Sequence, residues 1–500
     1  MVDYTKKAIK GTIITFIGIF SAAFFAYLTR VILARSLSPS DYGLFFAIFV
    51  FLSFIEFFKD FGTNAALVKY IAEFKVQKKY NLIKSSLVIT FLFQFSISLV
   101  LVIILFYFSD HLALNFFKNQ NASLIIKLLS LVFIFNIFDN LLRKIVHGYN
   151  KMHLLALLEF FRNLFIFIFI FIFLKAGFKI MAPTYSYIIS PILVFLIFSF
   201  IAIRFFISIK TKIKLNLNLF KKLLFFGIPS IFASFSDQII AFADVLILTF
   251  FIGKVGMITL DKIGIYNVVL PTALLILYFG RSIALVMMPL SSELWAKKEY
   301  AILAGGVARL HKYILIIVVP VALTIFSFSR LYLHLFFGDQ YASGAIALQL
   351  IIIGTIFFTL AKINNTVIQN IGKPKIVAII IAAAAALNII INFILIPLYG
   401  IEGAAIATSL TYIFAWLVSN HQIKKLIKTK IQWGNLSKIF FSGILFVLAV
   451  FFIKNILIIN PYLEFIITLA IAGIIYISLI FLLKIITIKE IKNLINIAKS

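Results

Sequence analysis

Four arginines lie within or near the long apolar stretches of this 500-residue chain, where a charge is costly and therefore informative. Arg30 and Arg281 have no oppositely charged residue three or four positions away, so they must meet partners from other helices, water or a substrate. A guanidinium group stays protonated in a low-dielectric site, and its paired N–H donors match phosphate oxygens. We therefore predict that four residues bind a phosphate or diphosphate group of the substrate: Arg30, Arg281, Arg143 and Arg162.

A second set of polar residues in the same stretches could bind a cation or a proton. Asp237 and Asp244 are seven residues apart, which puts them on one stripe of a helix. Such carboxylates could hold the arginines in place when no substrate is bound, or bind an ion whose gradient drives transport. The predicted residues that line a cavity or couple to H+ or Na+ are Asp237, Asp244, Asp139, Glu159, Lys362 and Asn365.

Several of these residues also have a purely structural interpretation. Asp139 and Arg143 are four residues apart, and Glu159 and Arg162 are three apart, so each pair can form a local ion pair near the headgroups. Lys362, near the end of its apolar stretch, can extend its ammonium group to the membrane surface. Both interpretations remain open at the level of sequence.

The elements that must position these residues are long apolar helices. Hydrophobic residues make up 63% of the chain and charged residues 13%, and the mean hydropathy is +1.14. A soluble domain carries about 25% charge, and an apolar run of about 18 residues crosses the hydrocarbon core as a helix. We predict an all-α integral membrane protein with about 14 transmembrane helices, near 11–34, 41–58, 85–107, 124–146, 153–174, 181–205, 223–252, 265–288, 309–335, 343–369, 376–397, 401–422, 437–457 and 463–485.

The distribution of Lys and Arg among the loops predicts how these helices are oriented. Loops on one side carry 35 of the 46 basic residues and loops on the other side carry 9, while Arg30 and Arg281 lie inside helices. The positive-inside rule then places both termini in the cytoplasm, in a multi-pass protein of the cell membrane. Glu56 and Lys59, at the end of the second helix, are expected at the membrane surface.

A weak internal repeat suggests two halves. Lys6-Lys7 precedes the first predicted helix and Lys221-Lys222 the seventh, and Gly43 is matched by Gly264, 221 residues later. Six helices separate the copies, so the copies share one orientation. We predict two parallel six-helix lobes around a central cavity, followed by two C-terminal helices, with an N-lobe at 1–215, a C-lobe at 216–430 and the additional helices at 431–500.

The composition argues against several other functions. The chain contains no cysteine, which excludes disulfides, thiol nucleophiles and thiolate metal sites. Its six histidines are scattered, and we expect neither a metal nor another cofactor. A net charge of +29 would suggest nucleic acid in a soluble protein, but here the basic residues belong to loops that face anionic lipid headgroups.

A series of short segments resembles a known family. Lys6-Lys7 with Gly11-Thr12, and six later segments in the same order, resemble the polysaccharide-biosynthesis flippases, which export polyprenyl-linked oligosaccharides. That family is part of the multidrug/oligosaccharidyl-lipid/polysaccharide exporter superfamily. The segments are 28–43 (LTRVILARSLSPSDYG), 60–66 (DFGTNAA), 226–229 (FGIP), 263–267 (IGIYN), 370–374 (NIGKP) and 397–405 (PLYGIEGAA).

The resemblance implies both a fold and a function. It implies 12 core helices in two lobes, with two more helices here, and a flippase that is not an enzyme. The cargo would be a glycan on an undecaprenyl- or dolichyl-type phosphate, moved from the cytoplasmic to the outer leaflet for surface polysaccharide or glycoprotein synthesis. The related lipid II flippases hold the diphosphate with arginines in their first and eighth helices, and Arg30 and Arg281 lie in comparable helices.

Two other functions would require different sequence features. A cation-coupled multidrug antiporter of the same superfamily would need a cavity dominated by carboxylates, with Arg30 and Arg281 facing elsewhere. A membrane glycosyltransferase would need acidic residues in large extracytoplasmic loops. The predicted loops on that side are short and carry few carboxylates, so the flippase is favoured.

Overall fold

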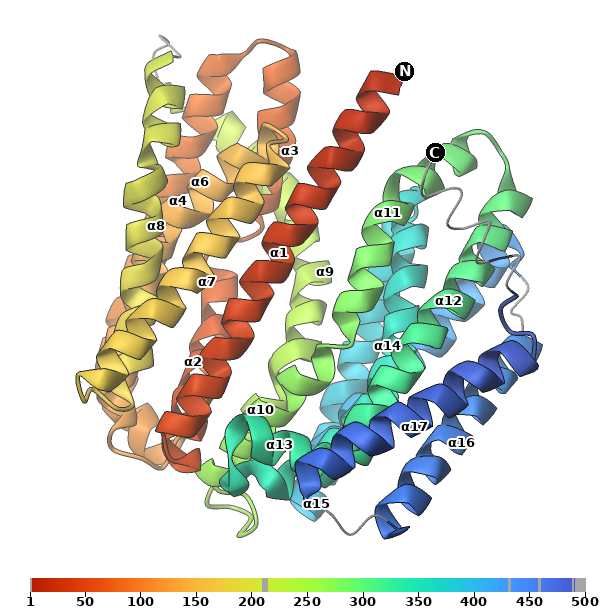
Figure 1. Cartoon of the computed structure of the whole chain (residues 1–500). Helices are drawn as coiled ribbons and strands as arrows, with labels where there is room; N and C mark the ends of the chain where they lie inside the picture. The colour runs from red at the N-terminus through yellow and green to blue at the C-terminus, as the bar shows by residue number, and fades with distance from the viewer. Residues whose placement is uncertain (1, 209–214, 430–432, 457–459, 488–489, 491–500) are drawn as a thin grey trace. The chain divides into compact units, whose positions relative to one another are not determined.

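The computed structural model describes the chain apart from residues 1, 209–214, 430–432, 457–459, 488–489 and 491–500, and it leaves out some further side chains, those of 281–289 among them. Every regular element in the described residues is a helix (Figure 1). The helices are α1 (Val2–Ser36), α2 (Pro39–Phe58), α3 (Thr63–Val76), α4 (Tyr80–Asn115), α5 (Ala122–Ser130), α6 (Val132–Gly148), α7 (Met152–Lys175), α8 (Met181–Ser208), α9 (Leu217–Phe250), α10 (Leu260–Leu274), α11 (Leu277–Ala296), α12 (Tyr300–Ser327), α13 (Ser329–Phe337), the 3-10 helix η1 (Asp339–Gly344), α14 (Ala345–Asn370), α15 (Pro374–Ile427), α16 (Trp433–Ile456) and α17 (Pro461–Leu482).

The prediction of an all-helical membrane protein is confirmed. Eleven helical segments of the described chain are long and apolar enough to cross a membrane. The predicted helices 376–397 and 401–422 both lie in α15, which Gly400 interrupts with non-helical backbone angles. Helices α1 and α9 are not among these eleven segments, and α15 is counted as one segment although it covers two predicted spans. The number of 14 spans therefore stays a prediction.

Three predicted helices are each divided in two. The stretch 124–146 becomes α5 and α6, 265–288 becomes α10 and α11, and 309–335 becomes α12 and α13. Between α10 and α11 the Leu275 N–H donates to the Thr272 oxygen three residues back, shortly after Pro271. Hydropathy does not register such a break, since the apolar character continues across it.

Helix α3 lies in a segment that the sequence analysis assigned to a loop. It is only 14 residues long and carries charges along one face, so it lacks the apolar length of a membrane span. Its other face is buried in a hydrophobic cluster with residues of α4, α6 and α9. The buried residues of this face are Ala66, Leu67, Tyr70, Ile71 and Phe74.

The chain forms two compact units. Unit 1 comprises Met1–Val268 with Ile396–Ile401, and unit 2 comprises Val269–Leu395 with Glu402–Ser500. In unit 1, α1 runs along α7, α7 packs on α8, and α2 packs on α5 and α9 (Figure 1). In unit 2, α14 packs on α11 and α12, and α16 packs on both α12 and α17. The predicted division into lobes at 215 and 430 stays a prediction.

In unit 1, α2 and α10 approach each other so closely that only glycine fits at the contact. A Cβ atom on Gly43 would lie 2.0 Å from the backbone oxygen of Leu260, and one on Gly264 would lie 2.1 Å from that of Pro39. The contact is reciprocal, because each glycine meets the carbonyl four residues before the other. The two glycines that the sequence repeat pairs are therefore in direct backbone contact.

In unit 2, the last helix is attached to α12 through a proline. Pro320 lies inside α12 and has no N–H, so the carbonyl of Ile316 lacks its usual helical donor. The phenol of Tyr476 in α17 donates to this oxygen at 3.3 Å. Helix α17, the second of the two helices predicted beyond the 12-helix core, is thus fixed by a hydrogen bond to a backbone group that would otherwise be unsatisfied.

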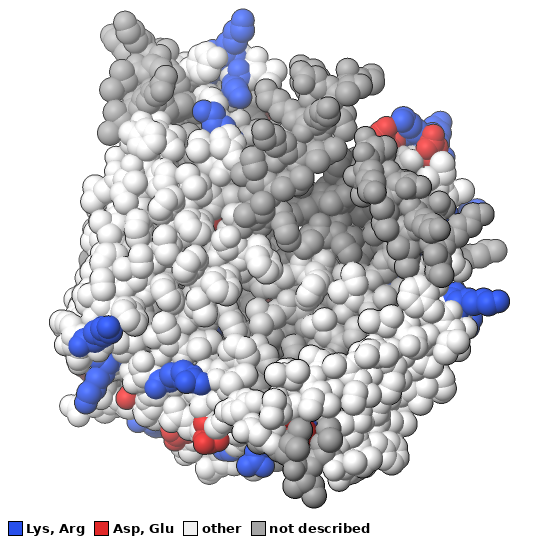
Figure 2. Space-filling view, in the orientation of Figure 1, with Lys and Arg blue, Asp and Glu red and all other residues white. Residues whose placement is uncertain are grey.

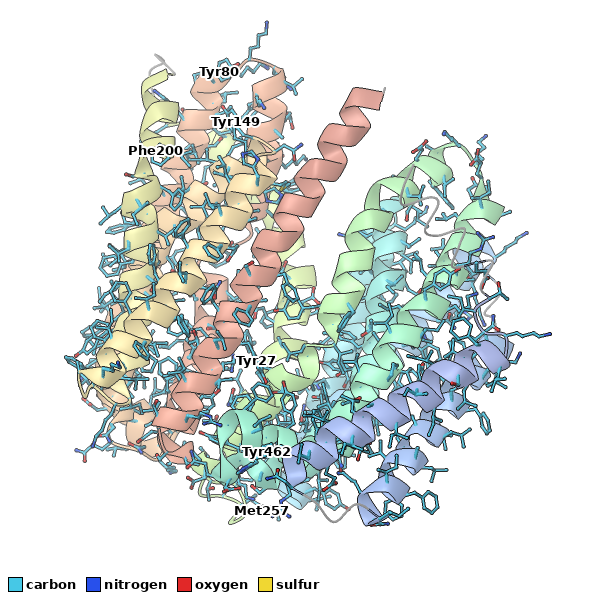
Figure 3. The ribbon with its side chains drawn as sticks, viewed as in Figure 1. Tyr27, Tyr80, Tyr149, Phe200, Met257 and Tyr462 are labelled. Carbon is cyan, nitrogen blue, oxygen red and sulfur yellow. The ribbon has the colours of Figure 1, made fainter. Side chains whose placement is uncertain are left out.

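The surface of unit 1 has the pattern of a membrane protein. On the left of Figure 2, Lys and Arg lie towards the upper and lower parts of this unit, and a broad band of other residues separates them. Figure 3 places Tyr80 and Tyr149 at one end of unit 1 and Met257 at the opposite end. The loops that contain Tyr80 and Met257 are also predicted from the sequence to lie on opposite sides of the membrane. Which end faces the cytoplasm rests on the charge distribution.

Candidate functional site

Arg30 lies in α1 and is held by backbone and aromatic groups of unit 1. Its Nη1 donates to the backbone oxygen of Asn267 at 3.1 Å, and its guanidinium carbon lies 4.4 Å from the centre of the Phe46 ring. The Asn267 oxygen is an available acceptor because Pro271, four residues later in α10, has no N–H to give it. The side chain is half-buried. A guanidinium group has five N–H donors, so beyond the Asn267 oxygen and the Tyr42 hydroxyl, which also interacts with Arg30, it has further donors that a ligand can use.

A buried ionic network joins α6 to α7. Arg143 of α6 donates from Nε to Asp139 Oδ2 at 2.9 Å, and its Nη1 lies 2.8 Å from Glu159 Oε1 of α7. Arg162 of α7 donates to the same Asp139 oxygen at 3.2 Å. Asp139 is fully buried and Arg143 is 5% exposed, so these charges are held almost out of water.

Helix α2 contributes to the same network. Lys59 is buried and bonds to Glu56 one turn earlier, while its ammonium group also donates to the backbone oxygen of Phe133 at 3.0 Å. Asn136 of α6 donates to Glu56 at 2.9 Å, and its own oxygen accepts a hydrogen bond from Arg162 at 3.3 Å. The network therefore ties together α2, α6 and α7.

The network fits a structural role for Arg143 better than a role in substrate binding. Its guanidinium group meets two carboxylates and the backbone oxygen of Leu158, which leaves little capacity for a ligand. Arg162 is more exposed, at 24% of its side chain. One oxygen of Asp139, Oδ1, is buried without a hydrogen-bond partner among the described residues. Such an atom can accept a proton or bind water.

The two predicted ion-coupling aspartates of α9 lie in different environments. Asp244 is 1% exposed, and the phenol of Tyr266 in α10 donates to its Oδ2 at 2.5 Å. Asp237, two turns earlier, is exposed. Both belong to unit 1, as do Arg30, Arg143 and Arg162.

The remaining candidates belong to unit 2. Lys362 in α14 is half-buried, with its ammonium nitrogen 4.9 Å from the centre of the Phe358 ring. Asn365 is 5% exposed, and both polar atoms of its side chain lack a hydrogen-bond partner in the described part of the chain. Arg281 lies on α11, and its side chain falls outside the described residues.

Sequence reasoning missed the contribution of α2. It expected Glu56 and Lys59 at the membrane surface, whereas the structure buries Lys59 and joins Glu56 to Asn136. The available signal was that both residues sit on one face of a helix, three positions apart, as do Asn136, Asp139 and Arg143 in α6. Nothing in the sequence says that these two faces meet.

Comparisons with known proteins agree with this fold. A family model described as polysaccharide biosynthesis protein matches residues 8–295, and a second model, MatE, matches residues 229–394. An uncharacterized membrane protein of Methanocaldococcus jannaschii is 30% identical, over 99% of both chains. The probable low-salt glycan biosynthesis flippase Agl15 of Haloferax volcanii is 22% identical, also over 99% of both chains.

A solved structure shows the same fold. The chain superposes on the lipid II flippase MurJ in its inward closed conformation with a TM-score of 0.75 and 20% identity, covering 93% of this chain and 98% of MurJ. The family resemblance predicted from short segments is therefore confirmed. By the match over residues 8–295 and its full-length relative, the chain belongs to the polysaccharide biosynthesis protein family of multidrug/oligosaccharidyl-lipid/polysaccharide exporters.

Proposed function

We propose that this protein is a flippase that moves an oligosaccharide linked to a polyprenyl phosphate from the cytoplasmic to the outer leaflet of the cell membrane. The lipid would be of the undecaprenyl or dolichyl type, and the glycan would serve surface polysaccharide or glycoprotein synthesis. Family membership supports this class of cargo, as does the similarity to the glycan flippase Agl15 and to the lipid II flippase MurJ. The proposed activity is transport and makes or breaks no covalent bond.

The observation that carries the proposal is the setting of Arg30. A guanidinium group at membrane depth needs an anionic or dipolar partner, and here a carbonyl and an aromatic face fix its position without neutralising its charge. A fixed, charged group of this kind suits the phosphate of a lipid-linked substrate. Arg281 is proposed as a second phosphate ligand, and Arg162 as a third.

Transport would proceed by alternating access of the two lobes. The phosphate pairs with Arg30 and Arg281 while the headgroup is open to the cytoplasm, the lobes then rock, and the polyprenyl tail stays in the lipid throughout. Asp244 and Asp237 are proposed to bind the proton or sodium ion whose gradient drives the return step. The buried side chains of Asn365 and Asp139 have polar atoms without a hydrogen-bond partner among the described residues, and these atoms are proposed to take part in ion binding.

The direct test is transport by the purified protein in proteoliposomes. The substrate is the pool of lipid-linked oligosaccharides extracted from the source organism. A membrane-impermeant lectin reports how much glycan has reached the opposite leaflet. We expect translocation well above that of protein-free liposomes, whereas transport equal to the protein-free control would refute the proposal.

A cation-coupled drug antiporter is the second candidate. The MatE match over residues 229–394 favours it, and so does the buried carboxylate of Asp244. The same proteoliposomes, loaded with ethidium and given a proton or sodium gradient, distinguish the two. Gradient-dependent ethidium movement without glycan translocation would favour the antiporter.

A further inference from the structure

Unit 1 contains a pocket that the phosphate-binding residues do not use. It has a volume of about 450 Å³ and lies where the turn between α2 and α3 meets α6 and α9. His147, which lines it, is two residues from Tyr149, so the pocket belongs to the end of unit 1 marked by Tyr80 and Tyr149 in Figure 3. This is the end that the charge distribution assigns to the cytoplasm. A substrate made in the cytoplasm would meet the pocket there.

The polar groups of the pocket come from the turn before α3 and from α3, α6 and α9, and hydrogen bonds fix two of them. Asp60 accepts a hydrogen bond at 2.8 Å from the N–H of Gly62, which closes the turn before α3. Asn64 lies in the first turn of α3. Its side-chain oxygen accepts a hydrogen bond from Gln94 at 3.3 Å, and its side chain also bonds to the Asp60 carboxylate, so one N–H of its NH₂ group remains for a ligand. Ser234 of α9 adds a hydroxyl group.

Two opposite charges line the pocket. Asp60 and Lys144 attract each other across it, although the described residues show no direct ion pair between them. The neighbouring Arg143 and Asp139 are, in contrast, ion-paired with each other and with residues of α7. Burial raises the pKa of Asp60, and the hydrogen bond from Gly62 opposes that rise. The pocket thus offers a carboxyl group and an ammonium group at separate points.

These groups match the chemistry of a sugar ring. A carboxylate accepts hydrogen bonds from sugar hydroxyls, and an amide NH₂ group donates to them. An ammonium group donates to hydroxyl or carboxylate oxygens, and Phe57 adds an aromatic ring to the lining. Ala65, Val68 and Ile231 also line the pocket, but a lipid tail would leave the carboxyl, amide and ammonium groups without hydrogen-bond partners. A volume of about 450 Å³ falls in the range of about 300–1,000 Å³ that is usual for small-molecule sites.

We propose that this pocket is a binding subsite for one pyranose residue of the transported glycan, with Asp60, Asn64 and Lys144 as its polar ligands. The proposal rests on the flippase function and adds the point at which the glycan itself is recognised. It also gives the protein a contact that distinguishes one glycan from another, which a phosphate clamp alone cannot do.

The test is binding of free monosaccharides to the full-length protein in nanodiscs. Saturation-transfer NMR is recorded with N-acetyl-D-glucosamine and with D-glucuronate, and dissociation constants come from the concentration dependence. We expect wild type to bind at least one of the two sugars. Asp60→Asn and Lys144→Gln should each weaken that binding about tenfold, the loss expected for a hydrogen bond to a charged group.

The variants and their controls are matched in chemistry. Asn at position 60 can still accept the hydrogen bond from Gly62, so Asp60→Asn keeps the turn, and Lys144→Gln provides an independent second variant. Glu73→Gln in α3 and Lys151→Gln before α7 change similar charges outside the pocket and should bind sugar as wild type does. Thermal unfolding of each variant confirms that it is folded.

The outcomes separate the subsite from the flippase. Binding of neither sugar by wild type, or equal binding by wild type and both pocket variants, would overturn the subsite even if wild type translocates the lipid-linked glycan. Pocket-dependent sugar binding together with failure of glycan translocation would overturn the flippase function, and with it the role of the subsite in transport. Loss of sugar binding in both variants, with translocation by wild type, supports the two proposals together.

Discussion

Arg30 in α1 donates a hydrogen bond to the backbone oxygen of Asn267 in α10, the carbonyl that Pro271 leaves without a helical donor. The proline therefore creates the acceptor that positions the arginine. In unit 2 the same device joins Tyr476 to the carbonyl freed by Pro320. In both places a proline inside an apolar helix produces a polar contact point for another helix, at a depth where unsatisfied carbonyls are costly.

The glycine contact between α2 and α10 gives a first prediction. Gly43→Ala and Gly264→Ala each place a methyl group about 2 Å from a backbone oxygen, so the two helices must separate. We expect each variant to lose about 1–3 kcal/mol of stability, as overpacked sites do, and to unfold at a lower temperature. Gly305→Ala in α12, where the added methyl meets open space, is the control and should unfold no earlier than wild type. Unchanged unfolding of both α2 and α10 variants would contradict the close contact.

The network of α2, α6 and α7 gives a second prediction. Arg143→Met removes one of the two arginine partners of the fully buried Asp139, and should cost about 3–5 kcal/mol. Lys151→Met, an exposed position between α6 and α7, should change stability little. Thermal unfolding in detergent measures both. If Arg143→Met were as stable as wild type, Arg143 would not be a structural residue, and the prediction that it binds the substrate would be favoured instead.

The attachment of α17 gives a third prediction. Tyr476→Phe removes the hydrogen bond to Ile316 while keeping the ring, and should cost about 0.5–1.5 kcal/mol. The loss should appear as faster proteolysis of the segment that holds α16 and α17. Tyr462→Phe, at the exposed start of α17, serves as the control and should be cut at the wild-type rate. Equal proteolysis of the two variants would mean that the tyrosine hydroxyl does not hold the helix.

The sequence predicts those structural features that depend on residues close together in the chain. Apolar length predicts the helical segments, and the absence of a nearby partner correctly predicts that Arg30 meets groups from other helices. The spacing of Asp139 and Arg143 likewise predicts their ion pair, although it cannot say that Arg143 reaches Glu159 rather than leaving it to Arg162.

Contacts between residues that are far apart in the sequence cannot be predicted from local spacing. Lys59 looks interfacial because it ends an apolar run, yet it is buried because α6 covers it, and no pattern within α2 reports that. Asp60 and Lys144 are 84 residues apart, and only the fold brings them to one pocket. Helix α3 is too short and too charged for a hydropathy window, although its buried face has helical spacing.

The measurement that tests the central claim most directly is glycan translocation in proteoliposomes by Arg30 variants. Arg30→Ala removes the phosphate ligand, and Arg30→Lys keeps the charge but loses the planar fork that can contact a phosphate and the Asn267 oxygen together. We expect Arg30→Ala to lower the translocation rate about 10- to 100-fold and Arg30→Lys to recover only part of it. Arg35→Ala, at the exposed end of the same helix, should translocate at the wild-type rate. Wild-type translocation by a folded Arg30→Ala protein would contradict the account.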